Sequence, residues 1–164
     1  SAHKKIMEYI EIGKDEGKPY LVNPINLSGN YIGPVLFEDV EPEAIIAQEE
    51  IFGPVIAIIR AEDLNKAFEI ANSTEYALTA GIYSRSPVNI QKARQELRAG
   101  NIYINRSITG ALVGRQPFGG FGMSGIGSKA GGPEYLLQFM HPVCISENVL
   151  RKGFAPTLSN STAT

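Results

Sequence analysis

Two adjacent carboxylates, Glu49 and Glu50, come just before a Gly-Pro turn in the run Gln-Glu-Glu-Ile-Phe-Gly-Pro. A carboxylate accepts short, strong hydrogen bonds, so Glu50 could bind a pair of hydroxyl groups such as a ribose presents. Phe52 could then provide an apolar wall for a flat ring. The alternative is a solvated turn in which both glutamates face water, and the spacing alone does not decide between these interpretations.

A second candidate site lies in the stretch from Gly100 to Pro133, which contains ten of the seventeen glycines. A long ordered loop in a compact domain is usually functional, and glycine lets the backbone approach a ligand closely. Successive N–H groups around Gly110 and Ala111 could form a concavity that binds an anion. Phe118 could cover that concavity with its ring. A plain turn is an equally good interpretation of the same residues.

Three other patterns predict no site. The run from Gly120 to Gly125 matches G-x-G-x-x-G, but no strand directly precedes it and no helix begins at its end, as a nucleotide turn requires. Cys144 is the single cysteine, and His141 would face the opposite side of a strand, so we expect Cys144 to be a small buried apolar residue. His3 and His141 lack carboxylates at ligand spacing, so no metal site is predicted.

The elements that position these residues follow from hydrophobic spacing. Residues 2–16 have the pattern of an amphipathic helix that ends at Gly17. Further strands are predicted at 35–37, 55–60, 78–83, 101–105 and 142–147, and further helices at 64–71, 87–99 (capped by Ser86 and closed by Gly100) and 133–140. The β-α-β-α-β order indicates an α/β protein with an open, doubly wound parallel sheet, whose first strand, 55–60, is buried on both faces. Ligands bind such sheets at the carboxyl ends of strands, where the glycine-rich stretch begins.

Length and composition limit the class of protein. The chain has 164 residues, of which 43% are hydrophobic and 20% charged, enough for one globular domain with a core. The net charge is −2 without a basic block, so we expect no nucleic-acid partner. We also expect no membrane span, because no apolar run approaches about 20 residues, and no signal peptide, because the N-terminus Ser-Ala-His-Lys-Lys leads directly into an amphipathic pattern. One cysteine allows no internal disulfide, which favours a reducing, cytoplasmic location.

Several motifs in order resemble the C-terminal part of an aldehyde dehydrogenase. They are Gln48-Glu-Glu-Ile-Phe-Gly-Pro-Val, Asn72-Ser-Thr-Glu-Tyr-Ala-Leu-Thr-Ala-Gly, Gly100-Asn-Ile-Tyr-Ile-Asn, Thr109-Gly-Ala-Leu-Val-Gly-Arg-Gln-Pro-Phe-Gly-Gly and Ser128-Lys-Ala-Gly-Gly-Pro-Glu-Tyr-Leu. The last two are similar to the branch that oxidises L-glutamate γ-semialdehyde, the open form of 1-pyrroline-5-carboxylate, to glutamate in proline degradation. The resemblance covers about residues 2–147. It implies an incomplete catalytic domain of that fold over 1–140 and an oligomerisation-type strand over 141–150. The small and polar residues of 151–164 predict a flexible tail.

The resemblance also implies roles for single residues. Glu50 would hold the nicotinamide ribose of NAD, and Phe52 would pack beside the nicotinamide. Gly110 and Ala111 would donate backbone N–H groups to the α-carboxylate of a small aldehyde substrate, and Phe118 would line the aldehyde pocket. The intact enzyme would be a homo-oligomer.

The same resemblance implies that no catalytic residue is present here. In this family a cysteine thiolate attacks the aldehyde and a glutamate base acts on the resulting thioester, and both precede the first helix of this chain, as does the dinucleotide-binding domain. The context of Cys144 does not match that nucleophile, so this chain alone is expected to be inactive. Two alternatives remain: an aldehyde dehydrogenase of other specificity, or a non-catalytic module that binds a dehydrogenase subunit through an edge strand.

Overall fold

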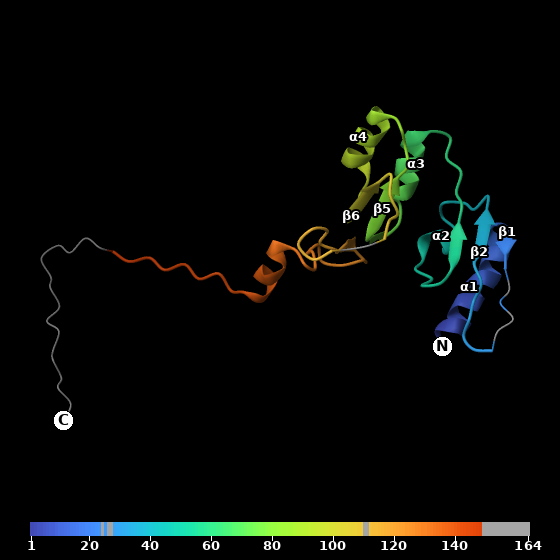
Figure 1. Cartoon of the computed structure of the whole chain (residues 1–164), viewed down its shortest axis with the longest axis horizontal. Helices are drawn as coiled ribbons and strands as arrows, with labels where there is room; N and C mark the ends of the chain where they lie inside the picture. The colour runs from blue at the N-terminus through green and yellow to red at the C-terminus, as the bar shows by residue number, and fades with distance from the viewer. Residues whose placement is uncertain (24, 26–27, 110–111, 149–164) are drawn as a thin grey trace, which may run out of the picture.

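The structure, a computed structural model, describes residues 1–23, 25, 28–109 and 112–148. Two α/β units follow one another along the chain, and a glycine-rich loop leads away from the second (Figure 1). The tail predicted for 151–164 lies outside the described residues.

The first helix, α1 (Ala2–Glu16), forms where the apolar spacing predicts it. The Ser1 hydroxyl caps its first turn by accepting a hydrogen bond from the Lys4 N–H at 3.5 Å, and Gly17 follows its last residue. Its buried stripe includes Ile6 and Ile10, which lie one turn apart.

That stripe packs on a small mixed sheet. The sheet consists of β1 (Lys18–Val22), β2 (Val35–Glu38) and β3 (Val55–Ala57), with α2 (Ile45–Gln48) between the last two. Strand β2 is central, antiparallel to β1 and parallel to β3. Phe37 on β2 has no exposed surface, and it lies in one apolar cluster with Ile6, Ile10 and Ile51.

The second unit contains the second parallel pair of strands. Its elements are α3 (Leu64–Ala71), β4 (Tyr76–Ala77), β5 (Thr79–Ile82), α4 (Pro87–Glu96) and β6 (Asn101–Ile104). Strands β5 and β6 are parallel, and Phe68, Ala93 and Leu97 form the buried cluster beneath the two helices. The Ser86 hydroxyl caps α4 by accepting from the Asn89 N–H at 3.3 Å, as predicted.

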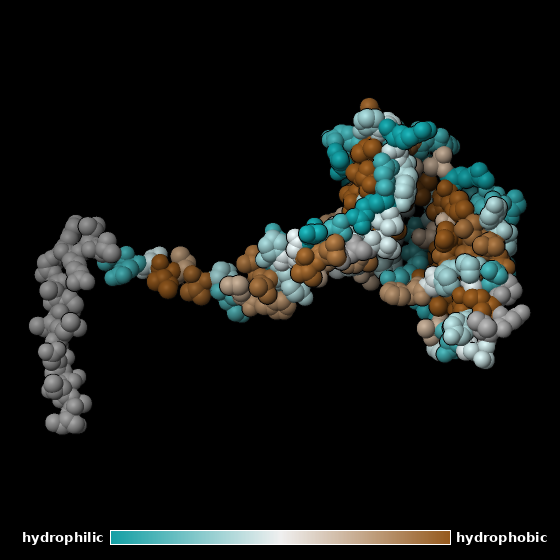
Figure 2. Space-filling view, viewed as in Figure 1, coloured by the Kyte–Doolittle hydropathy of each residue, from teal (hydrophilic) through white to brown (hydrophobic). Residues whose placement is uncertain are grey.

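The glycine-rich loop first pairs with the second unit and then extends away from it. Strand β7 (Phe121–Gly122) pairs antiparallel with β4, and η1 (Pro133–Phe139) is a 3-10 helix. Residues 141–148 then extend away from the rest of the chain (Figure 1). Figure 2 shows apolar side chains along this segment, where Val143 and Ile145 are exposed.

The structure corrects the predictions for one strand and one helix. Strand β3 has only three residues, Ile56 on it is 56% exposed, and it pairs with β2 rather than with β5, so the parallel strands form two sheets instead of one. Helix α4 ends at Glu96 with Leu97 as its C-cap, three residues before the predicted end at residue 99. An apolar run indicates burial, but long-range packing decides which strand it pairs with.

The segment 142–147 forms no strand, and Cys144 is exposed rather than buried. Extended backbone becomes a strand only when its N–H and C=O groups pair with a neighbouring strand. Within the described part of the chain, nothing pairs with these residues.

Candidate functional site

Helix α1 holds the loop that contains the two glutamates. Lys5 Nζ donates a hydrogen bond to the backbone carbonyl of Glu50 at 3.0 Å, and the Tyr9 hydroxyl donates to Glu49 Oε2. The hydrogen bond to the Glu49 carboxylate raises the pKa of Tyr9, because ionising the hydroxyl would remove the donor. Ile51 is buried between these contacts and the core, so the backbone on both sides of Glu50 is fixed.

The same loop presents its two predicted ligand-binding side chains to solvent. The Glu50 side chain is exposed and has no hydrogen-bond partner among the described residues. Phe52 is 85% exposed, and its backbone has φ of 57°, a left-handed conformation that a bulky residue rarely adopts. Such strain persists only where the surroundings impose it, and it is common in ligand clamps.

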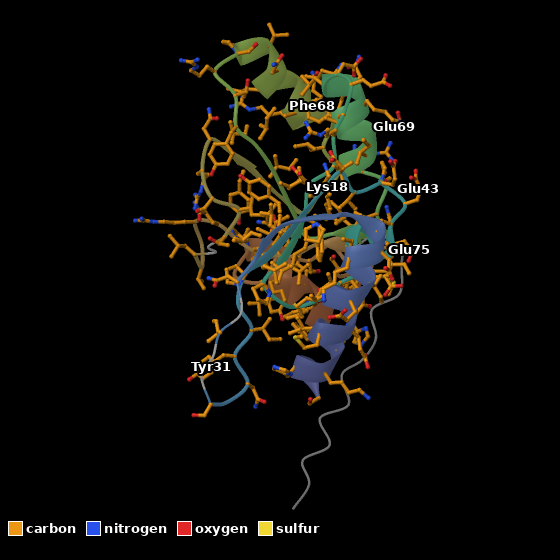
Figure 3. All side chains as sticks on the ribbon, turned by 90° about the vertical axis from the view of Figure 1, so that its right-hand side faces the viewer. Lys18, Tyr31, Glu43, Phe68, Glu69 and Glu75 are labelled. Carbon is orange, nitrogen blue, oxygen red and sulfur yellow. The ribbon has the colours of Figure 1, made fainter. Side chains whose placement is uncertain are left out.

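A cleft of about 490 Å³ opens beside this loop. It is lined by Lys5, Tyr9, Gln48, Glu49, Glu50, Glu75 and Tyr76. Glu75 lies beside α1, as its label in Figure 3 shows, so the cleft spans the junction between the two α/β units. A carboxylate rim of this kind favours ligands that donate hydrogen bonds.

A neighbouring cleft of about 300 Å³ shares Glu50 and reaches Ser124 in the glycine-rich loop. The Ser124 hydroxyl accepts a hydrogen bond from the Ala77 N–H at 3.1 Å, which ties the loop to β4. The structure therefore brings Glu50 close to one part of the glycine-rich loop. Neither of these two clefts is lined by Phe52 or Phe118.

Phe118 lies elsewhere on the same loop. Its N–H donates to the Ala130 carbonyl at 3.0 Å, and its own carbonyl accepts from the Ala130 N–H at 2.8 Å. The residue is half-buried. The predicted anion donors, Gly110 and Ala111, lie outside the described residues, so the distance from Phe118 to that concavity stays a prediction.

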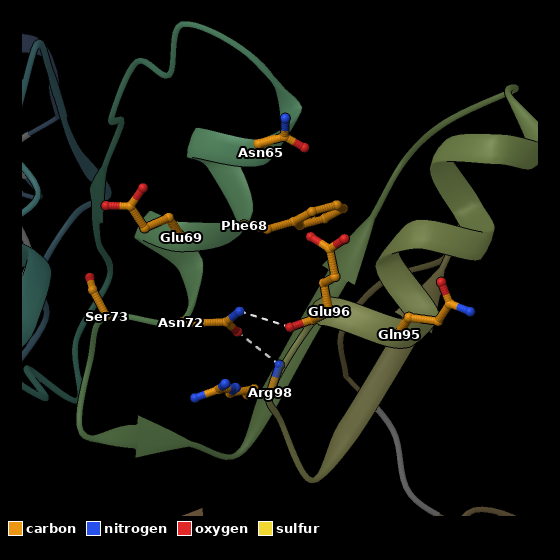
Figure 4. Close-up of a pocket in the computed structure, with 8 residues that line it drawn as sticks. All are labelled: Asn65, Phe68, Glu69, Asn72, Ser73, Gln95, Glu96 and Arg98. Atoms are coloured by element: carbon orange, nitrogen blue, oxygen red, sulfur yellow. Dashed lines mark hydrogen bonds between the residues drawn. The ribbon is translucent and has the colours of Figure 1, made fainter.

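The remaining clefts and side-chain clusters of the described chain give no second candidate site. A larger cleft of about 580 Å³ lies between α3 and α4 and contains none of the predicted site residues (Figure 4). The described residues include no cluster of His, Cys, Asp and Glu that could hold a metal ion, and no helix among them could cross a membrane.

Sequence analysis missed the residues that hold the site. Lys5 and Tyr9 are four residues apart on α1, a spacing that places them on one face, but nothing local shows that this face meets Glu50. Asn101 and Ser124 bind backbone groups of distant segments, and neither has a sequence signal for that contact.

Comparison with known proteins identifies the class. The sequence profile described as the aldehyde dehydrogenase family matches residues 1–145, so the chain belongs to that family. A 1-pyrroline-5-carboxylate dehydrogenase of Geobacillus sp. (strain WCH70) is 55% identical over 148 residues, which are 90% of this chain and 29% of that protein. The chain thus spans less than a third of the length of this curated relative.

Solved structures also show the similarity to 1-pyrroline-5-carboxylate dehydrogenases. A 1-pyrroline-5-carboxylate dehydrogenase from Thermus with bound NAD has a TM-score of 0.82 and 50% identity over 84% of this chain and 27% of its own. Proline utilization A from Bdellovibrio bacteriovorus has a TM-score of 0.86 and 54% identity over 94% of this chain and 16% of its own. The resemblance inferred from the motifs is confirmed, as is the predicted α/β fold class.

Proposed function

We propose that the intact protein is an NAD-dependent dehydrogenase that oxidises L-glutamate γ-semialdehyde, the open form of 1-pyrroline-5-carboxylate, to glutamate in proline degradation. The single observation that most supports this activity is the 55% identity over 148 residues to a 1-pyrroline-5-carboxylate dehydrogenase. The exposed side chains of Glu50 and Phe52, next to the Glu50 carbonyl that Lys5 of α1 binds, are consistent with it.

The fit of these residues to the cofactor follows from their chemistry. The Glu50 carboxylate is an unpartnered acceptor that matches the two hydroxyls of a ribose, and the exposed Phe52 ring is a surface for a flat heterocycle. When bound, NAD would supply the hydride acceptor for aldehyde oxidation. In this proposal Glu50 orients the nicotinamide ribose and Phe52 shields one side of the ring from water.

The glycine-rich loop would bind the aldehyde. The backbone N–H groups of Gly110 and Ala111 would donate to the α-carboxylate of the substrate, and Phe118 would line the pocket around its carbon chain. A carboxylate held by backbone donors gives specificity, because an aldehyde without it leaves those donors unpaired. Comparing aldehydes with and without an α-carboxylate on the intact enzyme tests this assignment, and equal kcat/KM values would contradict it.

No described residue supplies the reactive thiol. Cys144, the single cysteine, is exposed and lines neither of the two clefts that contain Glu50. We therefore propose that this chain alone is inactive and that the nucleophile belongs to the rest of the intact enzyme. NAD reduction by the purified 164-residue chain would contradict this.

Substitution of Glu50 tests the cofactor assignment. In the intact enzyme, Glu50→Gln should raise the KM for NAD about tenfold, because a charge-assisted hydrogen bond is worth about 1.5–3 kcal/mol and part of it survives in the amide. The KM for the semialdehyde should change little. Steady-state kinetics with Glu41→Gln as the control, an exposed glutamate outside both clefts, checks this, and equal KM values for NAD in the two variants would contradict it.

We also propose a cytoplasmic homo-oligomer in which residues 141–150 pair with a strand of another subunit. Val143 and Ile145 are 79% and 88% exposed, and residues 142–147 pair with no strand among the described residues. Exposed apolar side chains on extended backbone favour association. The single cysteine is consistent with a reducing compartment, which fractionation of cells that express the intact protein would test.

A further inference from the structure

The side chain of Asn101, the first residue of β6, binds the backbone on both sides of Phe118. Its Nδ2 donates to the Pro117 carbonyl at 2.9 Å, and its Oδ1 accepts from the Gly119 N–H at 3.2 Å. A neutral amide offers one donor group and one acceptor in fixed positions. Both are used here, and they determine where the Phe118 backbone lies relative to β6.

The remaining backbone groups of this segment are also paired. Phe118 exchanges two hydrogen bonds with Ala130, at 3.0 and 2.8 Å. Gly119 packs so tightly that an added Cβ would lie 2.5 Å from the Ser128 carbonyl oxygen. The Phe118 backbone is therefore held from two sides, by β6 and by residues 128–130.

Lys129 adds a third contact. Its ammonium donates to the Gly119 carbonyl and lies 5.0 Å from the centre of the Phe121 ring. Burial lowers the pKa of Lys129, since the surrounding chain removes water from the ammonium. The group is thus packed into the loop rather than free in solvent.

Asn101 is itself rigidly placed. It pairs with Thr79 in the parallel register of β5 and β6, and its N–H donates to the Leu78 carbonyl at 3.0 Å. A side chain on a paired strand fixes the position of a neighbouring segment more firmly than a side chain on a loop, because the strand backbone moves little.

We propose that Asn101 is a positioning residue that sets the place of Phe118 in the aldehyde pocket and so contributes to the choice of aldehyde. This inference rests on the proposed function of Phe118. A substitution that keeps the shape of the side chain but removes the Nδ2 donor would place an acceptor against the Pro117 carbonyl, and the segment would shift.

The chain contains a matched control. Asn72 makes the same pair of contacts elsewhere, with Nδ2 donating to the Glu96 carbonyl at 2.8 Å and Oδ1 accepting from the Arg98 N–H at 2.8 Å (Figure 4). The residue between them, Leu97, belongs to the apolar cluster under α3 and α4. Asn72→Asp therefore makes the same chemical change beside a residue of the apolar core rather than beside the proposed aldehyde pocket.

The experiment compares Asn101→Asp with Asn72→Asp in the intact enzyme. For Asn101→Asp we expect the KM for the aldehyde to rise about five- to tenfold, as for a lost, partly buried hydrogen bond, with the KM for NAD unchanged. Amide hydrogen exchange of Phe118 and Gly119 should become faster in this variant only. Asn72→Asp should lower the melting temperature while leaving both KM values unchanged.

Two results would overturn the inference. One is unchanged amide exchange of Phe118 and Gly119 in Asn101→Asp, and the other is faster exchange with unchanged KM for every aldehyde tested. The exchange measurement does not depend on activity. If the wild-type enzyme instead prefers an aldehyde other than the semialdehyde, the proposed substrate is wrong, and the KM for the preferred aldehyde decides the role of Asn101.

Discussion

At the scale of single residues, two side chains on α1 decide how Glu50 is presented. Lys5 binds the Glu50 carbonyl and Tyr9 binds the Glu49 carboxylate, so the exposed Glu50 side chain stands on a fixed backbone. Pre-organisation of this kind lowers the entropy lost when a ligand binds. We therefore expect the pair to contribute to the affinity for NAD by holding the backbone that presents Glu50.

Tyr9→Phe tests that contribution. In the intact enzyme it should raise the KM for NAD about two- to threefold, since it removes one partly exposed hydrogen bond. Because the pKa of Tyr9 is raised in the folded chain, its stabilising effect is complete below about pH 10 and is lost as the pH rises past the raised value. Kinetics beside the control Tyr20→Phe, at the 70% exposed Tyr20 of β1, check this, and a variant with wild-type KM would argue against the role.

At the scale of elements, α1 lies so close to β2 that only glycine fits at one position. A Cβ added at Gly13 would lie 2.5 Å from Cε2 of Phe37, whose side chain is fully buried and cannot move aside. Alanine is normally favoured over glycine inside a helix by about 0.5–1 kcal/mol. The packing reverses that preference.

We therefore expect Gly13→Ala to destabilise the intact enzyme by about 1–3 kcal/mol, as overpacked cores do. Thermal unfolding should show a lower melting temperature than the wild type. Asp15→Ala, at an exposed position of the same helix, is the control and should leave the melting temperature equal or higher. A rise with Gly13→Ala would show that helix propensity outweighs the contact.

At the scale of the whole molecule, residues 141–148 extend away from the rest of the chain (Figure 1). They form no secondary structure, and Val143 and Ile145, two residues apart, would share one face of a strand. In the intact protein, Val143→Lys with Ile145→Lys should produce a smaller assembly by sedimentation, because charges oppose burial at an interface. The apolar exchange Val143→Ile with Ile145→Val should preserve it. Equal masses for both variants would contradict the proposed subunit contact.

The sequence by itself determined the features that depend on neighbours along the chain. The stripes of α1 and α3, the Ser86 cap and the parallel strands β5 and β6 follow from local spacing, and the ordered motifs indicate the family. Only the tertiary structure decided that β3 pairs with β2, that Cys144 is exposed and that Asn101 binds the backbone around Phe118. Those outcomes depend on contacts between residues far apart in sequence, which local spacing does not specify.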